Sequence, residues 1–440
     1  MRASVTFSAV IFLSVILVSY SDADESLSSD EQESVYRVLE AINSDVDWRS
    51  LYPDDLCISG PHGIVCDYFH GRLHVTELNL GYVSDYSSNP SCSSNSSFSP
   101  RIASFPFLRK LLFYRCFTGE RVVLPGYLWN LNSSSLEELY LLDNPSLEGV
   151  VSGRIGCFTR LRRIVLSGSR IGGILPESVG NLSRLEQLVM TRNRFSGEVP
   201  RNIGMLKNLK ILDLSYNRLT GFLPEDVGLL SHLLKLDLSF NRIEGEVPNS
   251  LVGLQILEFV DLSYNRFSNS GIPLFLADMP RLREVYLSGN PLGGQIPEIW
   301  EKLGGVLGLG LSGLGLVGCI PRSMGLFLRN VCYLGLDNNM LEGTVPFELE
   351  LLESLKEMNL ENNRLSGKIS LPVKFHAKVK LGGNHDLCVD SSKSGVVLGS
   401  LKVCRKPVTP DAMAVLSRGS SSELSLALFS FLCLFSLLAF

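Results

Sequence analysis

A 24-residue period is the feature that most constrains the fold of this 440-residue chain. Three consecutive segments, beginning at Leu185, Leu209 and Leu233, read LEQLVMTRNRFSGEVPRNIGMLKN, LKILDLSYNRLTGFLPEDVGLLSH and LLKLDLSFNRIEGEVPNSLVGLQI. In each segment leucine-type residues occupy positions 1, 4 and 6, asparagine position 9, glycine position 13 and proline position 16. A period of this length indicates a solenoid, in which each unit contacts only its neighbours.

The period continues on both sides of these three segments. Within a unit, the pattern L-x-x-L-x-L predicts a short strand whose leucines point inward while the residues between them face solvent. One unit cannot bury its own leucines, so stacked units should share a continuous core, with a parallel sheet on one face. Matching units begin at Leu136, Leu161, Leu257, Leu282, Val306, Val331 and Leu355, and looser ones at Val75 and Leu108.

The other regular residues of the unit are expected to serve the scaffold. The asparagine after the strand can use its side-chain amide to satisfy backbone groups where the chain turns, and an unpaired buried group costs roughly 1–3 kcal/mol. Glycine at position 13 permits a tight turn, and proline at position 16 fixes φ. The asparagines are Asn193, Asn217, Asn241, Asn265, Asn290, Asn339 and Asn363.

Some units depart from the pattern. Ser169 and Leu314 replace the asparagine of position 9, and the unit that begins at Val306 is rich in glycine, with Gly308 and Gly310 inside its strand. Glycine weakens a strand and often marks a bend or a close backbone approach. We therefore expect a local irregularity in this unit.

Both ends of the chain resemble processing signals. Residues 1–21 carry a basic residue, an apolar run and then small residues, the pattern of a cleaved signal peptide. Residues 424–440 are apolar apart from three serines and follow a linker, 405–423, that is rich in small residues. This tail fits either a signal for a glycolipid (GPI) anchor or a short transmembrane segment. Both interpretations place the folded part outside the cell and leave no room for a cytosolic kinase.

Composition excludes some functions and agrees with secretion. The net charge of −5 gives no basic footprint, so we expect no nucleic-acid partner. Ten cysteines fit an oxidising compartment. Asn95, Asn132 and Asn181 begin sequons that can be glycosylated in the secretory pathway.

Strand positions 3, 5, 7 and 8 should face the concave side, where the core does not constrain them. They hold a column of Asp213, Asp237 and Asp261 beside a column of aromatic residues. Exposed aromatic and arginine side chains are typical of protein interfaces, so we expect a partner to bind between Tyr114 and Tyr264. The candidate contacts are Tyr114, Arg115, Tyr140, Arg163, Gln187, Thr191, Arg192, Asp213, Tyr216, Asp237, Phe240, Asp261 and Tyr264.

Catalytic and metal sites are not predicted. The aspartate column could be compared with glycosidase carboxylates, but its members are expected to be exposed, with no pocket around them. His70 and His74 lie four residues apart near Cys66, but no second pair completes a zinc site, so they are interpreted as solvent-exposed. No phosphate loop, nucleophile elbow or kinase signature occurs, and we expect neither an enzyme nor a cofactor.

The unit LxxLxLxxNxLxGxIP resembles the plant leucine-rich repeat of receptor kinases and receptor-like proteins, over residues 48–404. Two details are similar to the group of Too Many Mouths and the Piriformospora-indica-insensitive proteins: the cap segment from Cys57 to Cys66, and a serine-rich insertion with Cys92 and Cys116. The resemblance implies an α/β leucine-rich-repeat solenoid, with a parallel sheet on the concave face, short helices or 3-10 turns on the convex face, and disulfide caps. It divides the chain into an N-terminal cap (22–74), about twelve repeats (75–372) and a C-terminal cap (373–404).

The resemblance also suggests how the cysteines pair. Cys57 with Cys66 and Cys388 with Cys404 would close the caps, and Cys92 with Cys116 would hold the insertion. Cys319 and Cys332 are close enough in sequence to pair, although spacing does not fix connectivity. Cys157 is left over, and we expect a buried thiol there rather than a bridge to another chain.

The function implied is recognition. The resemblance favours a cell-surface receptor-like protein or co-receptor, with no kinase domain, that binds a protein or peptide ligand and pairs with a transmembrane receptor kinase in development or defence. The alternative is a secreted defence protein like the inhibitors of polygalacturonases, which need no membrane anchor. Fold alone does not choose the ligand.

Overall fold

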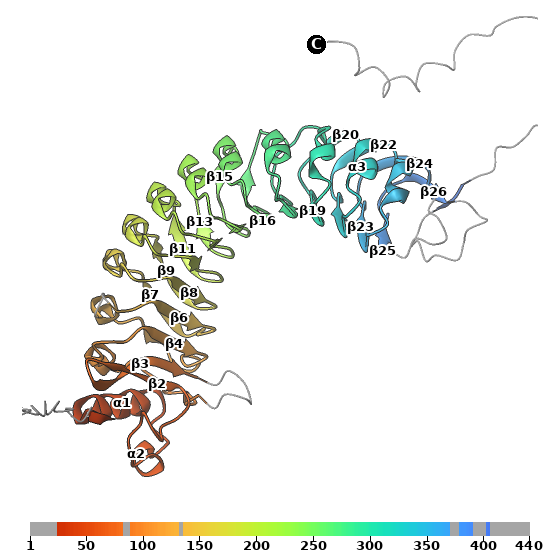
Figure 1. Ribbon diagram of the computed structural model, residues 1–440. Helices are drawn as coiled ribbons and strands as arrows, with labels where there is room; N and C mark the ends of the chain where they lie inside the picture. Colours follow the sequence, from red (N-terminus) through yellow and green to blue (C-terminus); the bar gives the residue numbers. More distant parts are fainter. Residues whose placement is uncertain (1–23, 82–88, 132–134, 370–377, 390–401, 405–440) are drawn as a thin grey trace, which may run out of the picture.

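The computed structural model describes residues 24–81, 89–131, 135–369, 378–389 and 402–404. Over these ranges the chain forms one curved solenoid, with strands along the inside of the arc and short helices along the outside (Figure 1). The predicted signal peptide, Asn132, the linker and the apolar tail lie outside the described residues. Among the described helices, none has the length and apolar character needed to cross a membrane.

The concave face is a 15-stranded sheet within the described ranges. Its repeat strands are parallel and in register, so Leu188, Leu212 and Leu236 align at position 4 of successive units and are fully buried. The predicted concave sheet is thereby confirmed. Its strands from the repeats are β3 (Arg72–Leu80), β4 (Lys110–Tyr114), β6 (Glu138–Leu142), β8 (Arg163–Ser167), β10 (Gln187–Val189), β12 (Ile211–Asp213), β14 (Lys235–Asp237), β16 (Phe259–Asp261), β18 (Glu284–Tyr286), β19 (Gly308–Gly310), β21 (Tyr333–Gly335), β23 (Glu357–Asn359) and β25 (Lys378–Lys380).

A second series of parallel strands follows position 9 of most units, and the leucine pattern does not predict it. These strands span about positions 10 to 14, where an exposed residue is followed by a buried one, as in β9. They form sheets of five, two and five strands among the described residues. The strands are β5 (Val122–Val123), β7 (Leu147–Val150), β9 (Arg170–Ile174), β11 (Arg194–Gly197), β13 (Arg218–Leu219), β15 (Glu244–Gly245), β17 (Arg266–Phe267), β20 (Val317–Cys319), β22 (Met340–Thr344), β24 (Arg364–Ile369), β26 (Asp386–Val389) and β27 (Lys402–Val403).

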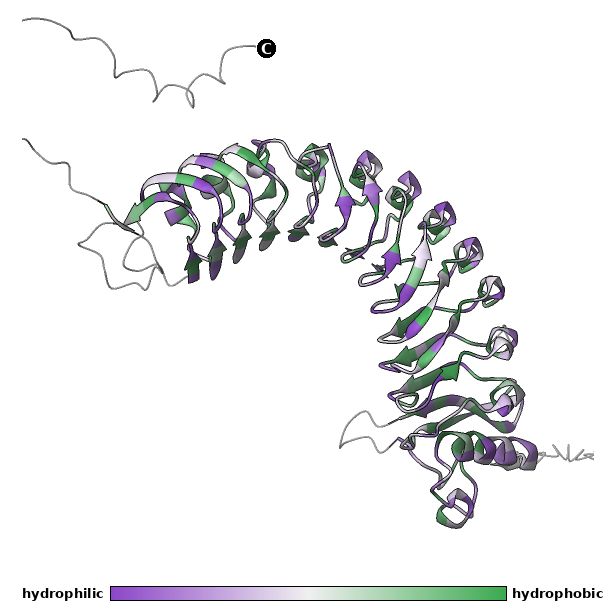
Figure 2. Ribbon diagram, turned by 180° about the vertical axis from the view of Figure 1, so that it is seen from behind, coloured by the Kyte–Doolittle hydropathy of each residue, from purple (hydrophilic) through white to green (hydrophobic). Residues whose placement is uncertain are grey.

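The convex face consists of one-turn helices, as expected. The proline of position 16 precedes most of them in an extended conformation (Pro200 has φ −70° and ψ 140°), which ends the preceding segment before the helix begins. The short helices are η1 (Pro100–Ser104), η2 (Gly126–Asn130), η3 (Gly153–Cys157), η4 (Glu177–Asn181), η5 (Arg201–Met205), η6 (Glu225–Leu229), η7 (Asn249–Gly253), η8 (Leu274–Asp278), η9 (Trp300–Leu303), α3 (Arg322–Phe327) and η10 (Phe347–Leu351). Figure 2 shows hydrophobic residues recurring along the strands of the concave face.

The asparagine of position 9 joins successive units through the backbone. Asn241 Nδ2 donates to the carbonyl oxygens of Leu214, Leu238 and Ser239 at 2.9, 3.0 and 3.2 Å, and its Oδ1 accepts from the Leu219 amide at 3.0 Å. The buried Leu219 amide would otherwise lack a partner, and the three carbonyl oxygens gain a donor in addition to those from neighbouring residues. The predicted scaffold role of this asparagine is confirmed.

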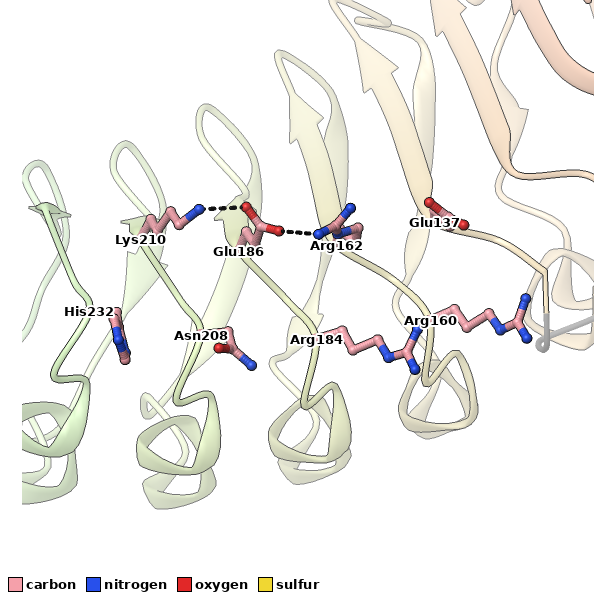
Figure 3. A pocket seen from close by; sticks show the side chains of 8 residues that line it. All are labelled: Glu137, Arg160, Arg162, Arg184, Glu186, Asn208, Lys210 and His232. Atoms are coloured by element: carbon pink, nitrogen blue, oxygen red, sulfur yellow. Dashed lines mark hydrogen bonds and ion pairs between the residues drawn. The ribbon is translucent and has the colours of Figure 1, made fainter.

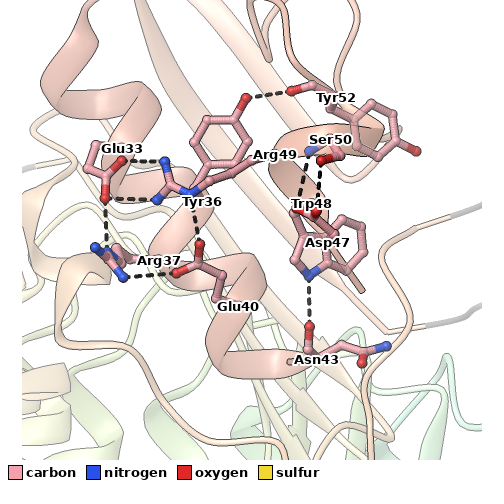
Figure 4. A network of polar contacts seen from close by, with 10 residues as sticks. All are labelled: Glu33, Tyr36, Arg37, Glu40, Asn43, Asp47, Trp48, Arg49, Ser50 and Tyr52. Carbon is pink, nitrogen blue, oxygen red and sulfur yellow. Dashed lines mark hydrogen bonds and ion pairs between the residues drawn. The ribbon is translucent and has the colours of Figure 1, made fainter. Parts of the chain in front are cut away.

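The N-terminal cap covers the first repeat strand with α1 (Ser29–Ile42), α2 (Trp48–Leu51), β1 (Asp24–Leu27) and β2 (Ile64–Phe69), which is antiparallel to β3. On its outer surface, Arg49 bridges Glu33 and Glu40 of α1, while the indole of Trp48 donates to the Asn43 carbonyl oxygen at 2.8 Å (Figure 4). The cap therefore gives the apolar end of the solenoid a charged outer face.

Three disulfides form the pairs that the family resemblance implied, namely Cys57–Cys66, Cys92–Cys116 and Cys388–Cys404. Cys319 and Cys332 do not bond to each other, because Cys319 ends β20 of a second-series sheet whereas Cys332 directly precedes β21 of the concave sheet. Cys157 is exposed at the end of η3, so the prediction of a buried thiol was wrong. Its backbone follows the buried Ile155 and Gly156, and the helical turn directs position 157 outward.

The glycine-rich unit is regular, contrary to prediction. Gly308 pairs with Glu284 on one side and with Tyr333 on the other, without a bulge. Gly308 and Gly310 are buried because the Tyr286 ring covers them: β-carbons at these positions would lie 2.4 Å from the Tyr286 hydroxyl and 2.7 Å from its Cδ1. A large side chain on one strand thus occupies the space that its neighbour leaves empty.

Candidate functional site

Three aromatic rings stack along the concave side of the middle repeats. Tyr216, Phe240 and Tyr264 occupy position 8 of successive units, and their ring centroids are 4.2 and 4.4 Å apart. Each residue has a positive φ of 54–55°, which turns the chain out of the strand and points the ring away from the core. The rings remain 48%, 38% and 53% exposed, so this aromatic stack is a continuous accessible surface. We call it the aromatic stack below.

A hollow of about 460 Å³ adjoins the aromatic stack on the concave face. Its lining includes tyrosines from two strands that flank the glycine-rich β19, together with hydroxyl, amide and carboxylate groups. A cleft of this size suits a few side chains of a partner. The concave hollow is lined by Phe240, Asp261, Ser263, Tyr264, Tyr286, Ser288, Ser312, Tyr333, Asp337 and Asn359.

The tyrosines of the concave hollow are neutral hydrogen-bonding groups. Burial, followed by the hydrogen bond and charge of Glu284, raises the pKa of Tyr286. Burial, followed by the charges of Asp337 and Glu357, raises the pKa of Tyr333. The Tyr286 hydroxyl donates to Glu284 at 2.9 Å. At neutral pH both rings therefore offer apolar faces with an uncharged polar tip.

The aspartate column is placed differently from the prediction. Asp213 and Asp237 are buried rather than exposed. Oδ1 of Asp237 accepts from the Ser239 amide at 3.2 Å and from its hydroxyl at 2.7 Å, and Asp213 makes the same bonds with Ser215. Asp261 is half-buried and accepts from the Ser263 amide at 2.8 Å. These carboxylates are occupied in fixing the end of each strand.

Lys235 holds two of these carboxylates together. Its Nζ lies 2.7 Å from Asp213 and 3.4 Å from Asp237. Burial opposes the charge of Lys235, but the hydrogen bond and charge of Asp213 outweigh that cost and raise the pKa of Lys235. Burial and the neighbouring Asp213 raise the pKa of Asp237 despite the bonds from Ser239. The column is thus a partly neutralised structural cluster with no pair of open carboxylates.

The N-terminal candidates lie on adjacent strands β4, β6, β8 and β10. Tyr114 is half-buried with the Arg115 guanidinium 5.3 Å from its ring centroid. Arg163 pairs with Glu138, which also accepts from the Tyr140 hydroxyl at 3.1 Å. The remaining candidates also lie on the concave side. Gln187 and Thr191 are half-buried, and Arg192 is exposed.

A second hollow, of about 410 Å³, lies at the edge where the concave strands begin. Figure 3 shows Glu186 between Arg162 and Lys210, with oxygen–nitrogen distances of 3.0 and 2.8 Å. The hydrogen bond from Lys210 lowers the pKa of Glu186. Basic side chains dominate this edge hollow, which the sequence analysis overlooked: its lining is Glu137, Arg160, Arg162, Arg184, Glu186, Asn208, Lys210 and His232.

Two smaller predictions concern histidines and glycans. His74 is not solvent-exposed as expected: its Nδ1 lies 2.5 Å from Glu31, and its side chain is 17% exposed. Within the described residues, no group of histidine, cysteine and acidic side chains gathers as a metal site would.

Asn95 and Asn181 are exposed, so both sequons are accessible, and their glycosylation stays a prediction.

Comparison with family models matches the leucine-rich repeat at residues 159–219, 207–267 and 281–303. A 171-residue segment is 32% identical to receptor like protein 29 of Arabidopsis thaliana, covering 38% of this chain and 36% of that protein. The chain contains leucine-rich repeats and, over this segment, is similar to a plant receptor-like protein. A second relative, Piriformospora indica-insensitive protein 2 of Arabidopsis thaliana, is 36% identical over 171 residues, which are 36% of this leucine-rich-repeat chain and 40% of the relative.

Solved structures agree with the fold. The PEPR1-AtPEP1 crystal structure superposes with a TM-score of 0.65 at 25% identity, covering 82% of this leucine-rich-repeat chain and 52% of that one. The ectodomain of the Arabidopsis thaliana receptor kinase GASSHO1/SCHENGEN3, in complex with CASPARIAN STRIP INTEGRITY FACTOR 2, gives a TM-score of 0.52 at 25% identity, covering 68% and 41%. The chain covers less than half of either curated relative.

Proposed function

We propose that this protein recognises an extended segment of a protein or peptide partner on its concave face, and that it works as a cell-surface receptor-like protein or co-receptor. One observation carries the proposal: the aromatic stack and the concave hollow are contiguous, since Phe240 and Tyr264 belong to both. Rigid aromatic surface beside a polar-rimmed cleft supplies binding energy at small entropic cost.

The chemistry of this surface favours a partner segment with apolar side chains. Tyr286 and Tyr333 are uncharged, and the hollow is also lined by serine hydroxyls, the Asn359 amide and two carboxylates. Apolar side chains could displace water from the rings, while the polar rim could bond to the partner's backbone. The N-terminal candidates from Tyr114 to Arg192 would extend the same contact surface along the arc.

The relatives support this kind of function. The two curated relatives are named as a receptor like protein and as a Piriformospora indica-insensitive protein, and the GASSHO1/SCHENGEN3 structure is a complex with CASPARIAN STRIP INTEGRITY FACTOR 2. We infer by homology that the chain is secreted and glycosylated, works at the outer face of the plasma membrane, and signals by pairing with a receptor kinase.

Site-specific cross-linking tests the binding surface. A photo-reactive residue replaces Tyr264 in the full chain expressed in plant cells, and in a control it replaces Phe347, which is 65% exposed on the convex η10. The captured partner ectodomain is then purified and titrated against the wild type, Tyr264→Ala and Phe347→Ala. We expect Tyr264→Ala to weaken binding about tenfold, as loss of an aromatic interface residue does, and Phe347→Ala to have no effect. Equal capture at both positions, or unchanged affinity of Tyr264→Ala, would contradict the proposal.

Membrane attachment separates the receptor from the secreted inhibitor. Membranes from expressing cells are treated with a phospholipase that cleaves glycolipid anchors. Release of the protein supports the anchored receptor, retention supports a transmembrane segment, and a protein that is soluble before treatment favours the polygalacturonase-inhibitor-like alternative.

A further inference from the structure

Five arginines recur at position 10 of consecutive units, each 24 residues after the last. The first three begin or lie in the neighbouring second-series strands β9, β11 and β13, which run side by side (Figure 1). All five are exposed. We call them the arginine line: Arg170, Arg194, Arg218, Arg242 and Arg266.

None of these five side chains has an ion-pair or hydrogen-bond partner within the part of the chain that the structure describes. Two carboxylates on neighbouring strands do not pair with the arginine line. Glu148 of β7 forms an ion pair with Arg121, and Glu244 is the register partner of Arg266 without forming an ion pair with it. The chain as a whole carries a net charge of −5, so this row of five unpaired arginines is a positively charged region on a negatively charged protein.

The register of the second series sets the spacing of the arginine line. Arg194 is the register partner of Gly172, which lies two residues after Arg170 in the chain. In the same way, Arg218 is the register partner of Ser196, two residues after Arg194. In a parallel sheet, with strands about 4.7–4.9 Å apart and a rise of about 3.3 Å per residue, residues related by such a diagonal are about 8 Å apart. The stagger therefore produces an oblique row of positive charges.

Exposed apolar residues accompany the arginine line. Ile174, at the end of β9, is 67% exposed, and Phe222, after β13, is 66% exposed. In each of three middle units, the residue of the aromatic stack precedes the arginine of the line by two positions, as Tyr216 precedes Arg218. The exposed guanidinium groups of the arginine line favour a negatively charged partner.

We propose that the arginine line binds an extended acidic polypeptide segment whose carboxylates stand on alternate residues. Side chains on one side of an extended chain recur at about 6.4–6.8 Å, close to the spacing of the line and within the reach of flexible arginines. The mixture of arginine with exposed Ile174 and Phe222 is the composition of a protein interface and not of a purely ionic surface. This site is separate from the concave hollow and does not depend on its function.

A spacing-controlled peptide series tests this site. The probe is a synthetic peptide of alternating Glu and Ser with one glutamate for each arginine, and it is compared with a peptide of equal composition whose glutamates form a block, and with polygalacturonate. Binding to the full protein is measured by fluorescence anisotropy at low and high salt. We expect the alternating peptide to bind best and its affinity to fall with salt, because exposed charge pairs are screened.

Matched charge variants make the test specific. The line variant carries Arg194→Gln, Arg218→Gln and Arg242→Gln, and the control carries Arg154→Gln, Arg201→Gln and Arg281→Gln at exposed positions away from the line. We expect the line variant to bind the alternating peptide about tenfold more weakly, because it loses three exposed charge pairs. The control variant should bind the peptide as tightly as the wild type does. Both should melt like the wild type, because the arginines of the line have no partners in the described structure; if the line variant does not, Arg218→Gln alone is used. Equal loss in both variants, or tighter binding of polygalacturonate than of the alternating peptide, would overturn the proposal.

Discussion

The ring of Tyr264 lies against Gly289 of the next repeat, so closely that a β-carbon on Gly289 would come within 2.7 Å of the Tyr264 Cδ1 atom. Gly289 also has a φ of +72°. The close approach favours glycine here, whereas a left-handed backbone alone does not exclude a side chain, since the three residues of the aromatic stack adopt it at the same position of their units. The last ring of the aromatic stack therefore occupies space that the following unit leaves empty.

Gly289→Ala should displace Tyr264 and lower the free energy of unfolding by about 1–2 kcal/mol, the cost of a left-handed conformation for alanine. Chemical denaturation measures the loss. Gly305→Ala is the matched control, because Gly305 lies outside the left-handed region and has no heavy atom near the place of a β-carbon. Equal stability of the two variants would show that the contact with Tyr264 is unimportant.

Asn241→Ala should destabilise the solenoid by about 1–3 kcal/mol, because it leaves the buried Leu219 amide without its partner and removes one of the donors to three carbonyl oxygens. Asn241→Asp keeps the acceptor but cannot donate to three carbonyl oxygens, so we expect it to be destabilising as well. Urea denaturation followed by circular dichroism measures both. A loss below about 0.5 kcal/mol in Asn241→Ala would argue against this role.

Ser169→Asn should raise stability by about 1 kcal/mol, since the buried Ser169 hydroxyl has no partner among the described residues and other units carry asparagine at this position. Ser169→Ala is the control, which removes the hydroxyl without adding new bonds. Thermal unfolding should rank the asparagine variant above the alanine variant. The reverse order would mean that the local backbone does not fit the amide.

Asp237→Asn should stabilise the protein at neutral pH. The pKa of Asp237 is raised above its unfolded value of 3.8 by burial and by Asp213, so the native state binds its proton more tightly than the unfolded state. Stability from this group is therefore lost as the pH rises from 3.8 through the raised pKa, and is retained below 3.8. The stability gain of Asp237→Asn should appear as the pH rises through this window and vanish in acid. Denaturation at several pH values measures it, and a pH-independent difference would contradict the assignment.

Much of the fold follows from local chemistry. The spacing of leucines at positions 1, 4 and 6 gives the concave strands, Asn241 and its equivalents bond as expected, and the prolines precede the convex helices. The second series of strands was missed because its strands are short and lie in segments that read as turns. The disulfides Cys57–Cys66, Cys92–Cys116 and Cys388–Cys404 were implied by family resemblance.

The candidate site was predictable in part. Position 8 gave Tyr216, Phe240 and Tyr264 as surface residues, but their stacking depends on the distance between adjacent units. Tyr286 and Tyr333 were overlooked because the sequence does not show that a neighbouring glycine strand makes room for them. The repeat pattern predicts exposed Asp213 and Asp237, but Ser215, Ser239 and Lys235 enclose them.

The repeating architecture follows from the amino-acid sequence alone, because each unit must bury its leucines against similar neighbours and only stacking achieves this. The tertiary structure decided which surface residues act together. Contacts between units bring the rings of the aromatic stack together, form the concave hollow beside Gly308 and Gly310, and set the stagger of the arginine line. These depend on distances across strands about 24 residues apart, which no local pattern specifies.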